Sequence, residues 1–136
     1  MDKPAQRRFA PIPVDTEVIG KNVLDAAFAV HSALGPGLLE SVYEACLAHK
    51  LRQQKTLVDT QVVVPVVFEG IPIETGLRLD LLVGKLVIVE LKSVETMIPL
   101  YEAQLLTYLK VTGLRLGYLI NFNVVHLKDG IKRMVF

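Results

Sequence analysis

The hydrophobic period of the chain changes partway along its length, and this change constrains the fold more than any other feature. In the first part, apolar residues such as Ile19, Val23 and Val30 recur every three or four positions, which is typical of an amphipathic helix. From residue 60 the apolar residues are consecutive and β-branched, as in the run 62–68, which is typical of a strand. Such a chain is expected to pack helices on a sheet.

Two helices are expected before the change of period. The first begins at a cap on Asp15 or Thr16 and ends at a Gly-Pro-Gly turn at 35–37. The second spans about Leu38–Gln53. Two lines of side chains run along this second helix. The apolar line consists of Leu39, Val42, Cys46 and His49, and the other line of Glu40, Tyr43, Glu44 and Leu47. Cys46 is expected to be a buried small apolar residue.

Short strands and one helix are expected in the rest of the chain. Pro65 indicates that the first strand lies at a sheet edge or carries a bulge. The sequence 74–76, Glu-Thr-Gly, indicates a turn. The predicted strands are 62–68, 71–73, 77–83, 86–91, 114–120, 124–127 and 131–135, with a helix over 100–111. This order predicts an α/β fold, in which a central mixed sheet is flanked by helices.

The length and composition suit one compact domain. The 136 residues are enough for a single domain, so we expect a flexible N-terminal tail over 1–13 and one domain over 14–136. Apolar residues make up 51% of the chain, which fits a sheet covered on both faces or a subunit interface. On this basis we expect a homo-oligomer, in the form of a homodimer.

Composition also excludes several classes of protein. No run approaches about 18 uncharged apolar residues, so a transmembrane helix is excluded, and without an apolar leader we expect a cytoplasmic protein. Cys46 is the single cysteine, which excludes an intrachain disulfide. The net charge is +1, so nucleic-acid binding would have to come from a local patch. Phosphate-loop, dinucleotide-binding and nucleophile-elbow motifs are absent from the sequence.

Three charged residues stand out because they lie in apolar strands. Asp80 lies within the strand 77–83, and Glu90 and Lys92 lie at the end of the strand 86–91. Charged groups in such places are rarely buried unless they are paired or bind a metal. Glu90 and Lys92 are two residues apart and leave the same face of their strand. An ion pair between them is the more common outcome of this spacing, and a metal site is the alternative.

The metal-site hypothesis makes a demand on the hairpin that joins these strands. A two-residue loop at Gly84-Lys85 would pair Asp80 with Val89 and place Asp80 and Glu90 on opposite faces. A three-residue loop, or a bulge at Gly84, would pair Asp80 with Glu90 instead. Glycine permits such a loop because it adopts positive φ readily. Two paired carboxylates would then suit a hard cation such as Mg²⁺.

The helix over 100–111 carries a second candidate group. Gln104 and Tyr108 are spaced i, i+4 and share one face. Glutamine can hydrogen-bond a base or the backbone of a nucleic acid, and tyrosine can stack on a base or bind a phosphate. Alone, the pair is more often an ordinary helix surface contact.

The ordered set of motifs resembles the GxxExxY protein family, which is assigned to the PD-(D/E)XK nuclease superfamily. The resemblance covers roughly Ile19 to Phe136. It rests on the motif Gly37-Leu38-Leu39-Glu40-Ser41-Val42-Tyr43, followed by Asp80, by Glu90-Leu91-Lys92, and by Gln104 with Tyr108. The resemblance implies a restriction-endonuclease-like core that hydrolyses phosphodiester bonds of nucleic acid, with DNA as the expected partner.

The resemblance also implies roles for individual residues. Asp80, Glu90 and Lys92 match the catalytic residues, and Glu40 matches an acid that joins Asp80 and Glu90 at a site for Mg²⁺ or Mn²⁺. Gln104 and Tyr108 match an element that holds nucleic acid. Two further hypotheses stay open. One is a non-catalytic binding or assembly module that retains the fold and the metal site, and the other is hydrolysis of a small phosphoester.

Overall fold

The computed structural model describes residues 10–136, so most of the expected tail over 1–13 lies outside the described residues. Three α-helices and five strands follow one another, with a short 3₁₀ helix, η2, before the last strand. The helices are α1 (Val14–Leu34), α2 (Glu40–Gln53) and α3 (Pro99–Thr112), and η2 spans Leu127–Gly130. The strands are β1 (Val58–Phe68), β2 (Ile71–Val83), β3 (Val87–Lys92), β4 (Leu116–Asn121) and β5 (Ile131–Val135).

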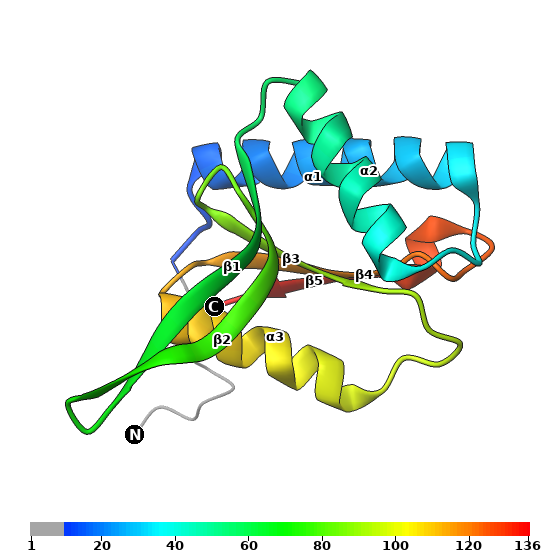
Figure 1. Ribbon diagram of the computed structural model, residues 1–136. Helices are drawn as coiled ribbons and strands as arrows, with labels where there is room; N and C mark the ends of the chain where they lie inside the picture. The colour runs from blue at the N-terminus through cyan, green and yellow to red at the C-terminus, as the bar shows by residue number, and fades with distance from the viewer. Residues whose placement is uncertain (1–9) are drawn as a thin grey trace.

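The five strands form one mixed sheet in the order β1-β2-β3-β4-β5. Neighbouring strands are antiparallel except β3 and β4, which are parallel and are joined through α3. Helices α1 and α2 cover one face of the sheet and α3 covers the other (Figure 1). The predicted α/β class, a central mixed sheet flanked by helices, is therefore confirmed.

Each face of the sheet carries its own apolar core. On the α1–α2 face, Tyr43, Leu47 and Phe122 are fully buried together with Val87 and Val89 of β3. On the α3 face, the smaller core consists of Leu79, Ile88, Leu105, Leu109 and Leu119. These two cores account for part of the high apolar content of the sequence, because a sheet covered on both faces needs apolar residues at consecutive positions. Within residues 10–136, no helix is both long enough and apolar enough to cross a membrane.

The predicted helices are present, but two details of the prediction were wrong. The cap of α1 is Pro13, without a side-chain hydrogen bond, and Asp15 lies in the first turn, where its Oδ1 accepts the N–H of Thr16 at 2.8 Å. The buried face of α2 is not the line of Leu39 and Cys46, because Leu39 is 73% exposed and Cys46 only half-buried. The buried residues of α2 are Tyr43, Leu47, Ala48 and Leu51.

Two parts of the strand prediction were also wrong. Residues 74–76 do not turn, because β2 runs unbroken through them. Gly76 instead lies against the bulge of β1, where an added Cβ would lie 2.4 Å from Val66 Cγ2. Residues 124–127 form no strand, and the chain passes through η2 into β5. The prediction from Pro65 is confirmed in both respects, since β1 is an edge strand with a bulge between Val64 and Val66.

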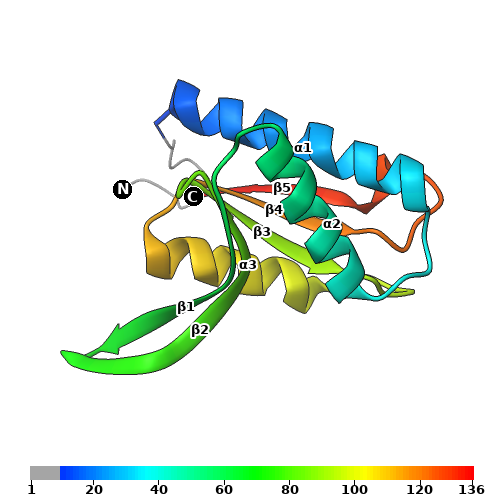
Figure 2. The same cartoon turned by 45° about the horizontal axis from the view of Figure 1, so that its top comes forward.

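The hairpin of β1 and β2 changes faces along its length. Near its base, Val58 and Leu81 belong to the core on the α1–α2 face. Farther out, Val62 and Leu79 belong to the core on the α3 face, although a regular strand would keep residues two or four apart on one side. Gln61 lies at the change, with a left-handed φ of 51°. Beyond it the hairpin extends as an arm past α3 (Figure 2).

Candidate active site

Asp80 and Glu90 lie next to each other where β2 and β3 separate. The ladder between these strands ends at the pair Leu81 and Val89. One step farther, the N–H of Asp80 donates to Glu90 Oε2 at 2.9 Å, and the N–H of Leu91 donates to Asp80 Oδ2 at 2.9 Å. Each carboxylate therefore takes the place of a backbone carbonyl in the ladder. The two acids close the end of the strand pair and are held by it.

The hairpin has the register that the metal-site hypothesis requires. Val83 pairs with Val87, so the loop has three residues, from Gly84 to Leu86. Gly84 and Lys85 have φ values of 59° and 57°, and glycine adopts the left-handed region readily. The same register, continued by three steps, places Asp80 opposite Glu90.

The Glu90 carboxyl group lies in an unfavourable place for a negative charge. Glu90 is 6% exposed. Burial is the largest cause, and the neighbouring Asp80 carboxylate the next, of a rise in the pKa of Glu90 from 4.5 to about 9. A positive charge on Lys92 acts in the opposite direction. Without a bound cation, Glu90 is therefore protonated at neutral pH.

Lys92 lies on the α3 face, beside a pocket lined by residues of α3. This pocket has a volume of about 390 Å³ and is lined by Lys92, Leu100, Tyr101, Ala103, Gln104, Thr107 and Tyr108. The ammonium of Lys92 lies 4.3 Å from the centre of the Tyr101 ring, within the range of a cation–π contact. The structure thus groups Lys92 with Gln104 and Tyr108, three residues that the sequence singled out.

Tyr108 connects this pocket to the pair of acids. Its pKa is raised above 10, first by burial and then by the negative charges of Glu90 and Asp80, while a hydrogen bond with Gln104 acts in the opposite direction. The Tyr108 hydroxyl therefore keeps its proton at neutral pH. It can donate a hydrogen bond to an anion that enters the pocket.

Glu40 lies near Asp80 on the side of the sheet that α2 covers. It is the first residue of α2, and it shares with Asp80 a small pocket of about 140 Å³. The loop before α2 is fixed by Tyr43, whose hydroxyl donates to Gly35 O at 2.6 Å and accepts the N–H of Leu38 at 3.1 Å. Tyr43 also stacks on Phe122, with ring centres 4.5 Å apart. The buried tyrosine of the G-x-x-E-x-x-Y motif thus holds in place the loop that presents Glu40.

The oxygen donors of the site suit a hard cation. Within residues 10–136, no three His, Cys, Asp or Glu side chains are grouped closely enough to hold a metal ion. Mg²⁺ is commonly bound through only one or two carboxylates, with waters and phosphate oxygens as its other ligands. Asp80 and Glu90 meet that requirement. Glu40 shares a pocket with Asp80 but does not complete a three-carboxylate group with the pair.

Two residues of this region were missed by the sequence analysis. Tyr101, which contacts Lys92, carried a signal, because it precedes Gln104 by three residues and Tyr108 by seven and so shares their helix face. Asn121 is buried at the end of β4, and its side chain bonds both the N–H and the carbonyl of Val94. It anchors the segment that follows Lys92. An amide directly after an apolar strand was the available signal.

A mixed sheet covered by helices on both faces, with two adjacent carboxylates and a lysine two residues after the second, defines a class of nuclease-like α/β domains. The family comparison agrees with this class and is more specific. The model of the PD-(D/E)XK nuclease superfamily matches residues 17–134, and the chain belongs to this superfamily. Comparison with curated proteins gave no match, and comparison with solved structures gave none.

Proposed function

We propose that the protein is a metal-dependent nuclease of the GxxExxY type that hydrolyses phosphodiester bonds of nucleic acid, with DNA as its substrate. The observation that carries the proposal is the pairing of Asp80 and Glu90 through backbone amides at the end of the β2–β3 ladder. A buried acid with a strongly raised pKa beside a second acid is typical of functional sites. Membership of the nuclease superfamily supports the same assignment.

In this proposal Asp80 and Glu90 would hold Mg²⁺ or Mn²⁺, and the charge of Glu40, which shares a pocket with Asp80, would attract the cation without ligating it directly. When bound, the metal would supply a water of lowered pKa and would polarise the phosphoryl group. Glu90 has to release its proton before it can serve as a ligand, because only the carboxylate binds a cation strongly.

The remaining residues act on the phosphate and on the nucleic-acid strand. Lys92 carries its positive charge on the same strand face as Glu90, where it can stabilise the negative charge that develops on the phosphoryl oxygens. The protonated hydroxyl of Tyr108 donates a hydrogen bond to a neighbouring phosphate. Gln104 bonds a base edge or the backbone and also orients Tyr108. Hydrolysis would thus proceed near the end of β3, between the pocket beside Lys92 and the pocket that Glu40 and Asp80 share.

The test combines a cleavage assay with calorimetry of Mn²⁺ binding. Lys92→Ala is expected to lower the cleavage rate at least about a hundredfold, while its free energy of unfolding and its Mn²⁺ binding stay close to wild type. Asp80→Ala and Glu90→Ala are expected to lose both cleavage and Mn²⁺ binding. Lys85→Gly is the matched control, because Lys85 is exposed in the loop of the same hairpin and glycine suits its left-handed backbone.

Two outcomes would contradict the proposal. Wild-type protein that binds Mn²⁺ but cleaves neither DNA nor RNA would favour the binding-module hypothesis. Cleavage that survives in Lys92→Ala and in Asp80→Ala would show that the activity belongs to another site or to a contaminant.

A further inference from the structure

Gln61 of β1 lies beside Asp80 of β2, so Gln61, Asp80 and Glu90 occupy neighbouring positions on three adjacent strands. Thr60 pairs with Leu81 and Val62 with Leu79, so Gln61 lies opposite Asp80. Its φ of 51° is left-handed, a conformation that glycine adopts freely and that other residues adopt rarely. A strained residue in the middle of a strand calls for an explanation beyond the regular structure.

The change of faces in the β1–β2 hairpin explains the backbone of Gln61 but not its side chain. A bend at this position would be formed most easily by glycine or asparagine. The chain instead carries a long side chain, and its Nε2 donates a hydrogen bond to Glu44 Oε1 of α2. Gln61 and Glu44 both line the small pocket that also contains Glu40 and Asp80. The carboxamide is therefore fixed over the side of the site that faces α2.

The charges around this pocket indicate what the carboxamide can do there. The pocket is lined by Glu40, Ser41, Glu44, Gln61, Asp80 and Leu91. Three of these residues carry carboxyl groups, and a phosphodiester placed among them would meet repulsion. Only Ser41 and Gln61 offer side-chain hydrogen-bond donors. After its bond to Glu44, the amide of Gln61 has one N–H left to donate.

We propose that Gln61 contacts the bound nucleic acid, by donating this second N–H to a phosphate oxygen of the backbone beside Asp80, and that Glu44 is the residue that positions it. This inference rests on the proposed nuclease function, and it assigns the α2 side of the site to the phosphate backbone. The contact involves no net charge on Gln61. It lets a phosphate approach the acids without adding a cation that would compete with the metal.

The experiment measures binding of a fluorescently labelled DNA oligonucleotide by anisotropy, in Ca²⁺ and over a range of salt concentrations. Gln61→Gly removes the carboxamide and suits the left-handed backbone, so it is expected to weaken binding about tenfold. Its unfolding midpoint is expected to equal or exceed that of wild type. Because no charge is removed, the slope of log Kd against log salt is expected to stay unchanged, whereas Lys92→Ala is expected to reduce it.

Further variants separate the contact from a structural effect. Gln61→Asn tolerates the left-handed backbone but shortens the side chain, and it is expected to bind as weakly as Gln61→Gly. Glu44→Gln keeps an oxygen that can accept the bond from Gln61 and removes one carboxylate that repels phosphate, so it is expected to bind at least as tightly as wild type. Glu44→Ala removes the same charge and also the acceptor, so it is expected to bind more weakly than Glu44→Gln.

The outcomes distinguish this inference from the function on which it rests. Wild-type binding together with unchanged binding by Gln61→Gly would overturn the role of Gln61 and leave the nuclease proposal standing. A wild-type protein that neither binds nor cleaves the oligonucleotide would overturn both. Weak binding by Glu44→Gln, equal to that of Glu44→Ala, would overturn the positioning role of Glu44.

Discussion

Glu90 makes the stability of the protein depend on pH in an unusual direction. Its pKa is about 9 in the folded protein and 4.5 as the ordinary value, so the folded state holds a proton that the unfolded state loses. The contribution of Glu90 to stability is then fully present below about pH 4.5 and is lost as the pH rises toward 9. Most acids that are ion-paired in a folded protein show the opposite dependence.

Glu90→Gln is therefore expected to stabilise the protein at high pH. The glutamine is close in shape to the protonated acid and does not titrate. In metal-free buffer, the difference in unfolding free energy between the variant and wild type should be small near pH 4.5, grow through neutral pH and level off near pH 9. Its full size should be a few kcal/mol, on the order of magnitude that follows from ~1.4 kcal/mol per pKa unit.

Urea unfolding at a series of pH values measures this difference. Glu74→Gln, at an exposed position of β2, is the control and should show no comparable growth with pH. A Glu90→Gln variant whose advantage over wild type is the same at pH 5 and pH 9 would contradict the buried, protonated state of Glu90.

Tyr101 is expected to affect activity through Lys92. The ring centre lies 4.3 Å from the ammonium, so Tyr101→Leu should let the lysine move and lower the cleavage rate about fivefold, the loss expected for ~1 kcal/mol of cation–π contact. Tyr101→Phe keeps the ring and should retain most of the activity. Measurement of kcat and KM for both variants tests this role of the ring. A Tyr101→Phe variant that loses as much activity as Tyr101→Leu would show that the hydroxyl is responsible instead.

At the scale of elements, the arm formed by β1 and β2 depends on the close approach of two strands. An alanine at Gly76 would place its Cβ 2.6 Å from the backbone nitrogen of Val66, which cannot rotate away as a side chain can. Gly76→Ala should therefore destabilise the protein by about 1–3 kcal/mol, the usual cost of overpacking. Urea unfolding measures the change, and Thr75→Ala, at the exposed neighbouring position, should have little effect. Amide exchange that is unaltered along β1 would contradict the local origin of the effect.

Local sequence signals predicted most elements, because a proline or a glycine acts on the backbone of its own segment. Pro65 predicted the edge position or bulge of β1, and the Gly-Pro-Gly turn at 35–37 predicted the end of α1. The turn predicted at 74–76 was wrong because the same glycine signal arose from a close approach to Val66, which is distant in sequence. Likewise, the buried face of α2 is chosen by its contact with Phe122, which α2 alone does not reveal.

The candidate site was predictable only in part, for the same reason. The spacing of Glu90 and Lys92 places both on one strand face, and the spacing of Gln104 and Tyr108 places both on one helix face, so these pairs follow from the sequence. Asp80 and Glu90 are adjacent because the hairpin loop has three residues rather than two. The sequence allowed both loop lengths, so it did not decide whether the two acids would meet. Gln61 gave no signal, because its strained backbone results from the change of faces in the whole hairpin.

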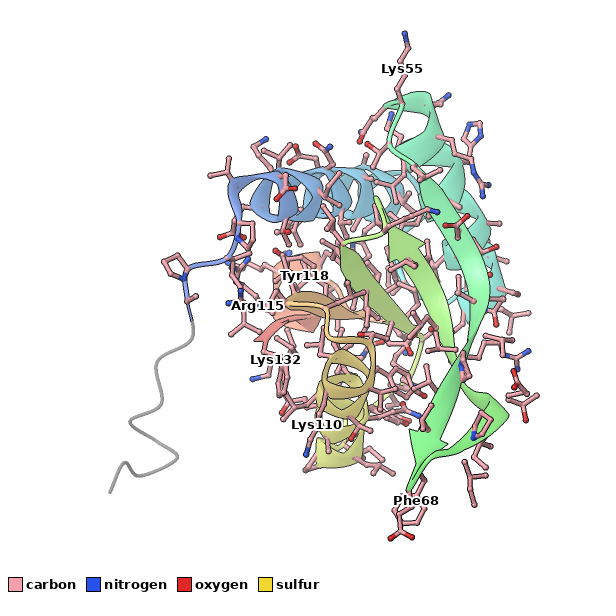
Figure 3. All side chains as sticks on the ribbon, turned by 90° about the vertical axis from the view of Figure 1, so that its left-hand side faces the viewer. Lys55, Phe68, Lys110, Arg115, Tyr118 and Lys132 are labelled. Carbon is pink, nitrogen blue, oxygen red and sulfur yellow. The ribbon has the colours of Figure 1, made fainter. Side chains whose placement is uncertain are left out.

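At the scale of the whole molecule, the tip of the arm exposes apolar side chains to solvent. Val67, Phe68 and Ile71 are 66%, 65% and 61% exposed, and Phe68 points away from the body of the protein at the tip of the hairpin (Figure 3). Exposed apolar groups that lie together often mark an interaction surface. The homodimer expected from the composition would find its apolar contact here.

Phe68→Asp combined with Ile71→Lys is expected to abolish a homodimer that forms through the tip of the arm, because each change places a charge in that apolar contact. Sedimentation velocity over a range of concentrations measures the oligomeric state. Val125→Lys is the control, since Val125 is 78% exposed in the segment before η2. A wild-type protein that sediments as a monomer at every concentration would contradict the dimer, and a variant that remains dimeric would place the contact elsewhere.

The separation of β2 and β3 at the two acids has a consequence for how this protein can change over evolutionary time. Apolar residues at positions 80 and 90 would remove the buried ionisable group but leave the N–H groups of Asp80 and Leu91 without acceptors. Amides would keep both acceptors and would carry no charge, so stability by itself favours asparagine and glutamine at these positions. A lineage that loses the proposed nuclease function is therefore expected to drift from the two acids to their amides.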